Sequence, residues 1–210
     1  MSVAEILGTV FALLCVGFTV RQNIWCWPTG ILNNIFFIVL FVKDRLYADL
    51  ALQVIYIALG FYGWWMWLYG GKRRSRLPVS RTPAFLLWSL AAVFVVATFL
   101  LARALNKAAV LMGVPGPDFV YWDSATTVAC LIAQWMLGNK LIENWPVWIA
   151  TNVSYIGLYS LKHRYLLSAL QVVFIVLSVI GYLRWKRELM HRQQDSSLAS
   201  SCPRTEGISS

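Results

Sequence analysis

The segment WPVWIATN, residues 145–152, repeats features of an earlier segment, WPTGILNN, residues 27–34. Both segments begin with Trp-Pro and end with Asn, and a constant offset of 118 residues pairs Asn34 with Asn152. Other uncommon residues match at the same offset without a gap: ALQV at 51–54 and 169–172, Gly63 with Gly181, and Trp67 with Trp185. Matched Trp, Pro, Asn, Gln and Gly at one register are improbable by chance, so the pattern indicates an internal duplication.

The composition of the chain places the duplicated segments in a membrane. The chain has 210 residues, of which 59% are hydrophobic and 13% charged, with a mean hydropathy of +0.63. Such values are not those of an ordinary soluble globular protein. Seven runs are long enough to cross roughly 30 Å of hydrocarbon: residues 4–20, 25–42, 47–69, 83–102, 120–137, 144–160 and 166–185. The first lacks the basic start and cleavage site of a signal peptide, so we predict an all-α integral membrane protein with seven transmembrane helices.

Lys and Arg are distributed unequally between the loops on the two sides of the predicted helices. One side carries twelve, most of them in residues 72–81 and 184–204, and the other side carries six. Because cytoplasmic loops collect Lys and Arg, this asymmetry predicts an outer N-terminus and a cytoplasmic C-terminus. It also explains the net charge of +9 without a nucleic acid partner.

The offset of the duplication determines how the two halves are oriented. It pairs the second predicted helix with the sixth and the third with the seventh, so both halves point the same way across the membrane. The fourth helix is then the linker of a parallel 3+1+3 internal repeat, an arrangement of small transporters with a site near the midplane between the halves. The predicted organisation is a first three-helix repeat at 1–70, a basic loop and linker helix with an outer loop at 71–117, a second three-helix repeat at 118–188, and a disordered cytoplasmic tail at 189–210.

Trp145, Trp148 and Asn152 form the main candidate site. Their spacing of three and four residues places them on one face of a helix. The two indoles offer stacking surfaces for a planar heterocycle, with a cation–π attraction if the ring is positively charged, and the amide offers hydrogen bonds. Two structural alternatives stay open: Trp145 as an anchor at the membrane interface, and Asn152 as a polar contact between helices.

Four further polar side chains within the predicted helices are candidate substrate contacts. The repeat supplies Asn34, Gln53 and Gln171, and the fifth helix carries Asp123 in the motif YWDSATT. Polar groups are costly against lipid, so these side chains are expected to face the interior of the bundle. For Asp123, three roles are equally open: binding a substrate hydroxyl, receiving a proton, and pairing with a basic neighbour. Glycines at helical spacing indicate close helix packing: Gly60, Gly63 and Gly181.

The remaining features argue against catalysis, a metal site and a cofactor. Gly71-Lys72 lacks the spacing of a P-loop, and the two histidines form no metal-binding motif. The four cysteines contain no CxxC pair. A membrane-embedded enzyme would need clustered carboxylates or histidines, which leaves it as a minor alternative. A scaffold in which the repeated amides only join helices is the other.

The chain resembles the PnuC family of bacterial vitamin transporters over roughly residues 4–188. The resemblance rests on four stretches: WPTGILNN at the second helix, LYADLALQVIYIALGFYGWWMW through the third, PDFVYWDS entering the fifth, and ENWPVWIATN entering the sixth. The family's WxxWxxxN pattern corresponds to Trp145, Trp148 and Asn152. This resemblance implies a fold like that of the SWEET sugar transporters with a full-length duplication, and a homo-oligomer such as a trimer.

The resemblance also implies a function. The commonest members of the family take up nicotinamide riboside by facilitated diffusion, which a cytoplasmic nucleoside kinase makes one-way by phosphorylating and trapping the imported nucleoside. We therefore expect an alternating-access uniporter in a bacterial inner membrane, with this small molecule and the lipid bilayer as its partners. The cationic pyridinium of the riboside suits the indoles, and its hydroxyls and carboxamide suit Asn and Gln. Relatives that carry thiamine or riboflavin keep these two vitamins as alternatives.

Overall fold

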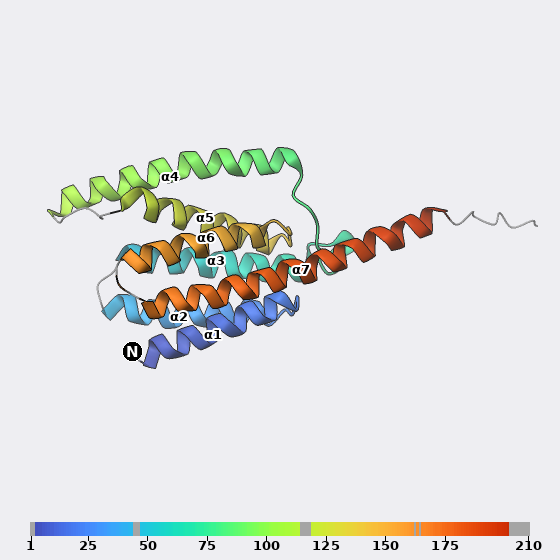
Figure 1. Ribbon diagram of the computed structural model, residues 1–210, viewed down its shortest axis with the longest axis horizontal. Helices are drawn as coiled ribbons and strands as arrows, with labels where there is room; N and C mark the ends of the chain where they lie inside the picture. Colours follow the sequence, from blue (N-terminus) through green and yellow to red (C-terminus); the bar gives the residue numbers. More distant parts are fainter. Residues whose placement is uncertain (1–2, 44–46, 114–118, 162, 164, 202–210) are drawn as a thin grey trace, which may run out of the picture.

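The computed structural model describes residues 3–43, 47–113, 119–161, 163 and 165–201, and it confirms the all-α prediction (Figure 1). Within these residues the chain forms seven α-helices and one short 3-10 helix, η1 (Lys72–Arg74). Each α-helix overlaps one of the seven predicted segments. In chain order they are α1 (Val3–Val20), α2 (Cys26–Lys43), α3 (Tyr47–Tyr69), α4 (Ala84–Met112), α5 (Val120–Gly138), α6 (Asn144–Leu161) and α7 (Tyr165–Ser201).

Three of these helices are long and apolar enough to cross a membrane, judged by length and composition. They are the stretches Asp49–Tyr69 in α3, Ala84–Leu111 in α4 and Tyr165–Gln194 in α7. The apolar stretches of α1 and α2 are shorter, at Ile6–Val20 and Cys26–Val42. The helices therefore have the character expected of a membrane protein.

Helix α4 continues beyond the predicted end of the fourth segment at residue 102. Arg103 and Lys107, expected in a loop, lie within the helix, because the sequence RALNKAAVLM at 103–112 consists largely of good helix formers. The helix stops at Gly113, whose φ of 63° is favourable for glycine and whose N–H bonds back to the last turn.

Helix α7 also extends further than predicted. The tail expected to be disordered from residue 189 is helical to Ser201, and residues 202–210 lie outside the described residues. No Gly or Pro interrupts residues 182–201, and Arg192 pairs with Glu188 one turn earlier at 3.2 Å. Hydropathy marked the end of the apolar stretch correctly, but it does not mark the end of a helix.

The helices pack as two groups of three with α4 beside them. Within the first group α1 contacts α2 and α2 contacts α3, and within the second α5 contacts α6 and α6 contacts α7. Two further contacts join the groups, α1 with α7 and α3 with α5. The two contacts are equivalent in the repeat, because the offset of 118 residues pairs α1 with α5 and α3 with α7. Helix α4 packs mainly on α5, at the edge of the bundle (Figure 1).

Three connections that together carry seven of the 18 Lys and Arg residues lie at one end of the bundle. Figure 1 shows the α1–α2 turn, the α3–α4 loop and the α5–α6 turn at this end, from which α7 projects, whereas the N-terminus lies at the opposite end. We call it the basic end. Its loops carry Arg21, Lys72, Arg73, Arg74, Arg76, Arg81 and Lys140.

Four tryptophans form the centre of a buried core at the basic end. Trp27 meets Trp67 edge-on with ring centroids 5.4 Å apart, and Trp145 meets Trp185 in the same way at 5.4 Å. The two pairs touch through Trp67 and Trp185, whose centroids are 6.1 Å apart. Edge-to-face aromatic pairs contribute stability in addition to that from the area they bury. This layer therefore holds the helices together at the basic end.

Gly63 and Gly181 make room for two of these indoles. A Cβ atom at Gly63 would lie 2.0 Å from Cη2 of Trp27, and a Cβ atom at Gly181 would lie 2.4 Å from Cη2 of Trp145. Neither distance is possible without displacing the ring. The prediction that these glycines serve helix packing is confirmed.

Two tryptophan hydrogen bonds cross between the two groups of helices. The Nε1–H of Trp67 donates to the carbonyl of Leu137 at 3.0 Å, and the Nε1–H of Trp185 donates to the carbonyl of Thr19 at 3.2 Å. Thr19 and Leu137, like the two tryptophans, are 118 residues apart. The core therefore ties each group to the last turn of a helix in the other.

The α3–α4 loop is fastened along the α5–α6 turn. The N–H of Ser80 donates to the carbonyl of Lys140 at 3.1 Å, and the N–H of Ile142 donates to the carbonyl of Ser80 at 3.0 Å. Two bonds from Thr82, one from its N–H and one from its hydroxyl, reach Oε2 of Glu143 at 2.8 and 2.6 Å. These bonds fix the turn from which α6 begins.

Candidate functional site

Two cavities lie side by side next to the tryptophan core. Their volumes are about 300 and 280 Å³, at the small end of the range for ligand pockets. Six residues line both of them: Cys15, Thr19, Asn33, Gln134, Leu137 and Trp148. Because of this shared wall we treat the cavities as one site with a first lobe and a second lobe.

The first lobe lies among the helices of the first group and α5. Beyond the shared residues, α2 contributes Asn34, and α3 contributes Gln53 and Tyr56. Asn33 Nδ2 lies 3.4 Å from Asn34 Oδ1, so the two neighbouring amides face one another at this wall. The predicted residues of the first half therefore meet in this lobe.

The second lobe lies among α1, α5, α6 and α7. Helix α6 contributes Trp145, Asn152 and Tyr155, and α7 contributes Gln171 and Ser178. Asn152 is 7% exposed and faces the protein interior, as predicted for a polar side chain in a membrane helix. The predicted residues of the second half meet here.

The structure brings six of the seven predicted site residues to the two lobes and separates the seventh. The six are Asn34, Gln53, Trp145, Trp148, Asn152 and Gln171. Asp123 lies in the first turn of α5 and lines neither lobe. That turn is at the end of the bundle away from the tryptophan core.

Trp148 occupies the wall between the two lobes. It is half-buried, and it is the one aromatic side chain that lines both cavities. Pro146 lies in the first turn of α6, where a proline disturbs no helical hydrogen bond. This start of the helix places Trp148 in the following turn, where it lines both cavities.

Trp145 is part of the core as well as of the cavity lining. It is 2% exposed, its ring lies against Gly181, and it meets Trp185 edge-on. This position is inside the protein and does not match an anchor at the lipid surface. Trp148 is therefore the better candidate for stacking on a ligand.

Four buried polar atoms of the lining lack a hydrogen-bond partner within the described residues. They are Trp27 Nε1, Asn33 Oδ1, Asn144 Oδ1 and Trp145 Nε1. Each of these residues lines one or both lobes. Since buried polar groups are normally paired, these atoms are available to water or to a polar ligand.

Charge is absent from both linings as far as the described residues define them. No Lys, Arg, His, Asp or Glu lines either lobe. The described part of the chain also holds no group of three or more His, Cys, Asp and Glu side chains placed for a metal ion. The lobes thus present aromatic rings, amides and hydroxyls, which suit a planar ring with neutral polar groups.

Gln134 is the main lining residue that the sequence analysis missed. It projects from α5 into both lobes, but the residue 118 positions earlier is Val16, so a search for repeated amides passes over it. The available signal was an amide inside the apolar run 120–137, the same signal that selected Asn152. Tyr155, whose hydroxyl lies 3.9 Å from Sγ of Cys130, was missed because tyrosine is common in such helices.

A larger cavity of about 960 Å³ lies between α4 and helices α5 and α6. Its lining is mostly apolar and includes Trp88, Phe94 and Ile132. Helix α4 is exposed along its apolar length, with Phe85 83% exposed and Trp88 76%. This cavity lacks converging polar groups and suits lipid or another apolar surface.

Comparison with known protein families gives one match that spans most of the chain. The family described as "Nicotinamide mononucleotide transporter" matches residues 2–187.

Individual relatives agree with this match. The chain is 28% identical over 204 residues to the nicotinamide riboside transporter PnuC of Escherichia coli (strain K12), covering 88% of this chain and 85% of the relative. It is 24% identical over 157 residues to the riboflavin/roseoflavin transporter RibM of Streptomyces davaonensis, covering 71% of this chain and 68% of that protein.

Among solved structures, the chain is similar in fold to the vitamin B3 transporter PnuC. The TM-score is 0.68 with 21% sequence identity, and the match covers 88% of this chain and 81% of the other. At this identity the likeness shows the fold.

Proposed function

The chain belongs to the nicotinamide mononucleotide transporter family, and from this membership we propose that it carries nicotinamide riboside across a bacterial inner membrane. The family name and the names of the relatives point to two related cargoes, a phosphorylated mononucleotide and an unphosphorylated riboside. The chemistry of the cavity distinguishes between them.

The observation that carries the choice of riboside is the uncharged lining of the two lobes. A phosphate dianion moved into a site without Lys, Arg or His loses its hydration and gains no charged partner, which is costly. The riboside has a cationic pyridinium that Trp148 can stack against, and hydroxyls and a carboxamide for the amides. We therefore assign stacking to Trp148, with Trp145 at its side, and polar contacts to the amides of both lobes: Asn34, Gln53, Asn152 and Gln171.

Riboflavin is the competing cargo with a named relative, and thiamine is the other alternative. The riboflavin relative matches a smaller share of this chain, 71% against 88%, at lower identity. Each single lobe is also small, at about 300 and 280 Å³, which suits the one aromatic ring of the riboside better than the three fused rings of the flavin. These two facts place the riboside first.

The transport mechanism we propose is alternating access by a parallel 3+1+3 repeat, as in the SWEET fold. Its support is the series of contacts that recur 118 residues apart: the two tryptophan pairs, the two packing glycines and the two crossing hydrogen bonds. The site lies between the two groups, so rocking one against the other would expose it to either side in turn. Asp123 would act at the approach from the N-terminal side.

Transport in this proposal is uniport driven by the riboside gradient. A cytoplasmic nucleoside kinase maintains that gradient by phosphorylating the imported riboside. The uncharged lining supports this mechanism, since intramembrane proton relays use Asp, Glu or His side chains, and no described residue of these types lines either lobe. The chain itself acts as a carrier and not as an enzyme.

We further propose that all seven helices cross the membrane with the basic end in the cytoplasm. Twelve Lys and Arg residues belong to that side of the chain and six to the other, which is the asymmetry of an outer N-terminus. The exposed apolar length of α4 and the cavity beside it support assembly into a homo-oligomer such as a trimer.

Calorimetric binding to the detergent-purified protein tests the cargo. Nicotinamide riboside, thiamine, riboflavin and nicotinamide mononucleotide are compared at equal concentrations. We expect measurable heat for the riboside alone. Selective binding of thiamine or riboflavin would show that the cargo is a different vitamin and would leave the carrier function in place. Binding of the mononucleotide would contradict the role given to the uncharged lining.

A further inference from the structure

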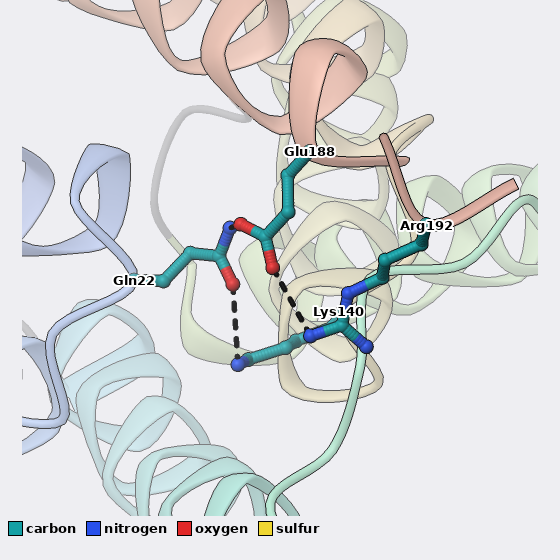
Figure 2. A network of polar contacts seen from close by, with 4 residues as sticks. All are labelled: Gln22, Lys140, Glu188 and Arg192. Atoms are coloured by element: carbon teal, nitrogen blue, oxygen red, sulfur yellow. Dashed lines mark hydrogen bonds and ion pairs between the residues drawn. The ribbon is translucent and has the colours of Figure 1, made fainter. Parts of the chain in front are cut away.

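A polar cluster closes the basic end of the bundle. Figure 2 shows its four side chains: Gln22 from the α1–α2 turn, Lys140 from the α5–α6 turn, and Glu188 and Arg192 from α7. Lys140 Nζ donates to Gln22 Oε1 at 3.4 Å, and Gln22 Nε2 donates to Glu188 Oε2. Arg192 pairs with the other carboxylate oxygen at 3.2 Å. Gln22 therefore bridges an ammonium of one turn to a carboxylate of α7.

Lys140 is held in an unusual place for a lysine. Its residue is 6% exposed, and its ammonium lies 4.4 Å from the centroid of the Trp67 ring. Its backbone has a positive φ of 50°, matched by 53° at Gln22, the residue 118 positions earlier. Both tight turns thus point these side chains at one another across the two groups of helices.

The titratable groups around Lys140 come from three elements packed on it. Glu188 and Arg192 face it from α7 and Arg76 from the α3–α4 loop, while the neutral thiol of Cys26 lies on α2. Burial lowers the pKa of Lys140 to about 8, and Glu188 opposes this shift more than any other group. The closed arrangement therefore holds a poorly hydrated cation whose main compensating charge is Glu188.

The cluster is connected to the cavity lining through two tryptophans of the core. Trp67, whose ring lies next to the Lys140 ammonium, donates a hydrogen bond to the carbonyl of Leu137, and Trp185 donates one to the carbonyl of Thr19. Leu137 and Thr19 each line both lobes. Opening this end therefore requires the two groups of helices to separate at the cluster and at the tryptophan layer beneath it.

We propose that Glu188 is the latch of the gate at the basic end, which it keeps shut by neutralising the buried ammonium of Lys140 through the bridge of Gln22. The inference rests on the proposed carrier function with the basic end in the cytoplasm. If α7 moves and carries Glu188 away, Lys140 is left as a buried charge without compensation. This destabilises the closed state and favours an open state in which water reaches the ammonium. Glu188 has no carboxylate counterpart in the first repeat, because the residue 118 positions earlier is Gly70.

The test measures access to the cavity from the cytoplasmic side. Cys15 lines both lobes and serves as the reporter after Cys26, Cys130 and Cys202 are replaced by alanine in the full chain. Inside-out membrane vesicles are treated with a charged, membrane-impermeant maleimide, and the labelling rate of Cys15 is divided by its labelling after denaturation. We expect Glu188→Gln, which keeps the hydrogen bond to Gln22 and removes the charge, to raise this rate about tenfold.

A second substitution separates the latch from a structural role. Lys140→Met removes the buried charge that Glu188 balances, so we expect the single variant to label no faster than the parent, and Glu188→Gln to cause no increase in labelling in the Lys140→Met background (the double variant). Arg187→Gln, an exposed charge next to Glu188, is the matched control and should not change the rate.

Two results would overturn the latch: labelling of Glu188→Gln at the parent rate, or labelling of the double variant as fast as that of Glu188→Gln. If Glu188→Gln does not accumulate in the membrane, recovery of the double variant to the parent amount supports the latch, and failure of both overturns it. The measurement uses no vitamin. A carrier of a different cargo would give the same labelling result while failing the binding test.

Discussion

Trp148 is the residue on which substrate recognition most depends in the function we propose. It stands in the wall shared by both lobes and is only half-buried, so it can present a ring face to the cavity. Trp145, three residues earlier, is enclosed by Gly181 and Trp185. The two tryptophans of the WxxWxxxN pattern should therefore respond differently to truncation.

For Trp148→Ala we expect the dissociation constant for nicotinamide riboside to rise about tenfold to a hundredfold, because a desolvated cation–π contact contributes about 2 kcal/mol. The melting temperature in detergent should change little. Trp145→Ala should instead lower the melting temperature strongly, since truncating a buried aromatic costs about 3–5 kcal/mol. Calorimetry and thermal unfolding distinguish the two, and unchanged riboside binding by a folded Trp148→Ala variant would remove that residue from the site.

Asn152 is one of the two repeated amides of the second lobe, with Gln171. Replacing it with alanine removes hydrogen bonds worth about 0.5–1.5 kcal/mol, so we expect roughly a threefold to tenfold weaker riboside affinity. Ser154→Ala is the matched control, because Ser154 lies on the same helix but lines the apolar cavity beside α4. If Asn152 only joins helices, its replacement will reduce stability and leave the affinity of the folded fraction unchanged.

The pH dependence of the gate follows from Lys140. In the closed state its pKa is about 8, whereas in an open, hydrated state it should return toward the ordinary value of 10.5. Between these values the closed state binds fewer protons, so closure becomes more favourable as pH rises above about 8. The labelling rate of Cys15 from the cytoplasmic side should fall about tenfold between about pH 7 and pH 9.

The same rate in Lys140→Met provides the correction for thiol ionisation, because that variant keeps Cys15 and lacks the titrating amine. Identical pH profiles for the parent and Lys140→Met would show that Lys140 does not titrate with closure.

At the scale of the helices, the packing glycines set how closely the elements approach. Gly63→Ala and Gly181→Ala each push a methyl group into an indole, so we expect each to destabilise the protein by about 1–3 kcal/mol and to lower the melting temperature by several degrees. Gly17→Ala is the control, since a Cβ at Gly17 meets nothing within 4 Å. A melting temperature for either variant equal to that of Gly17→Ala would show that the indoles can move aside.

Most elements could be predicted from the sequence because apolar runs and the 118-residue offset are strong signals. The ends of α4 and α7 could not, since a helix continues past the membrane boundary wherever the residues favour it, as RALNKAAVLM does at 103–112. The repeated amides led to the two lobes because both copies face the space between the groups. Gln134 and Lys140 escaped the same search because their counterparts at the offset are Val16 and Gln22.

At the scale of the whole molecule, the two groups of helices meet in an arrangement suited to alternating access. The basic end is closed by the tryptophan layer and the polar cluster, and the lobes lie next to it. What the sequence could not predict is this asymmetry between the ends, because it depends on contacts between residues as distant as Gln22 and Glu188.

The most direct measurement of the carrier proposal is entrance counterflow in proteoliposomes loaded with unlabelled nicotinamide riboside, with no proton or sodium gradient. Radiolabelled riboside outside should accumulate transiently in the wild-type vesicles. External unlabelled riboside should compete, nicotinamide mononucleotide should not, and Trp148→Ala should abolish the accumulation. Absence of riboside counterflow in vesicles that exchange riboflavin or thiamine, or accumulation that appears only with an imposed ion gradient, would contradict uniport of nicotinamide riboside.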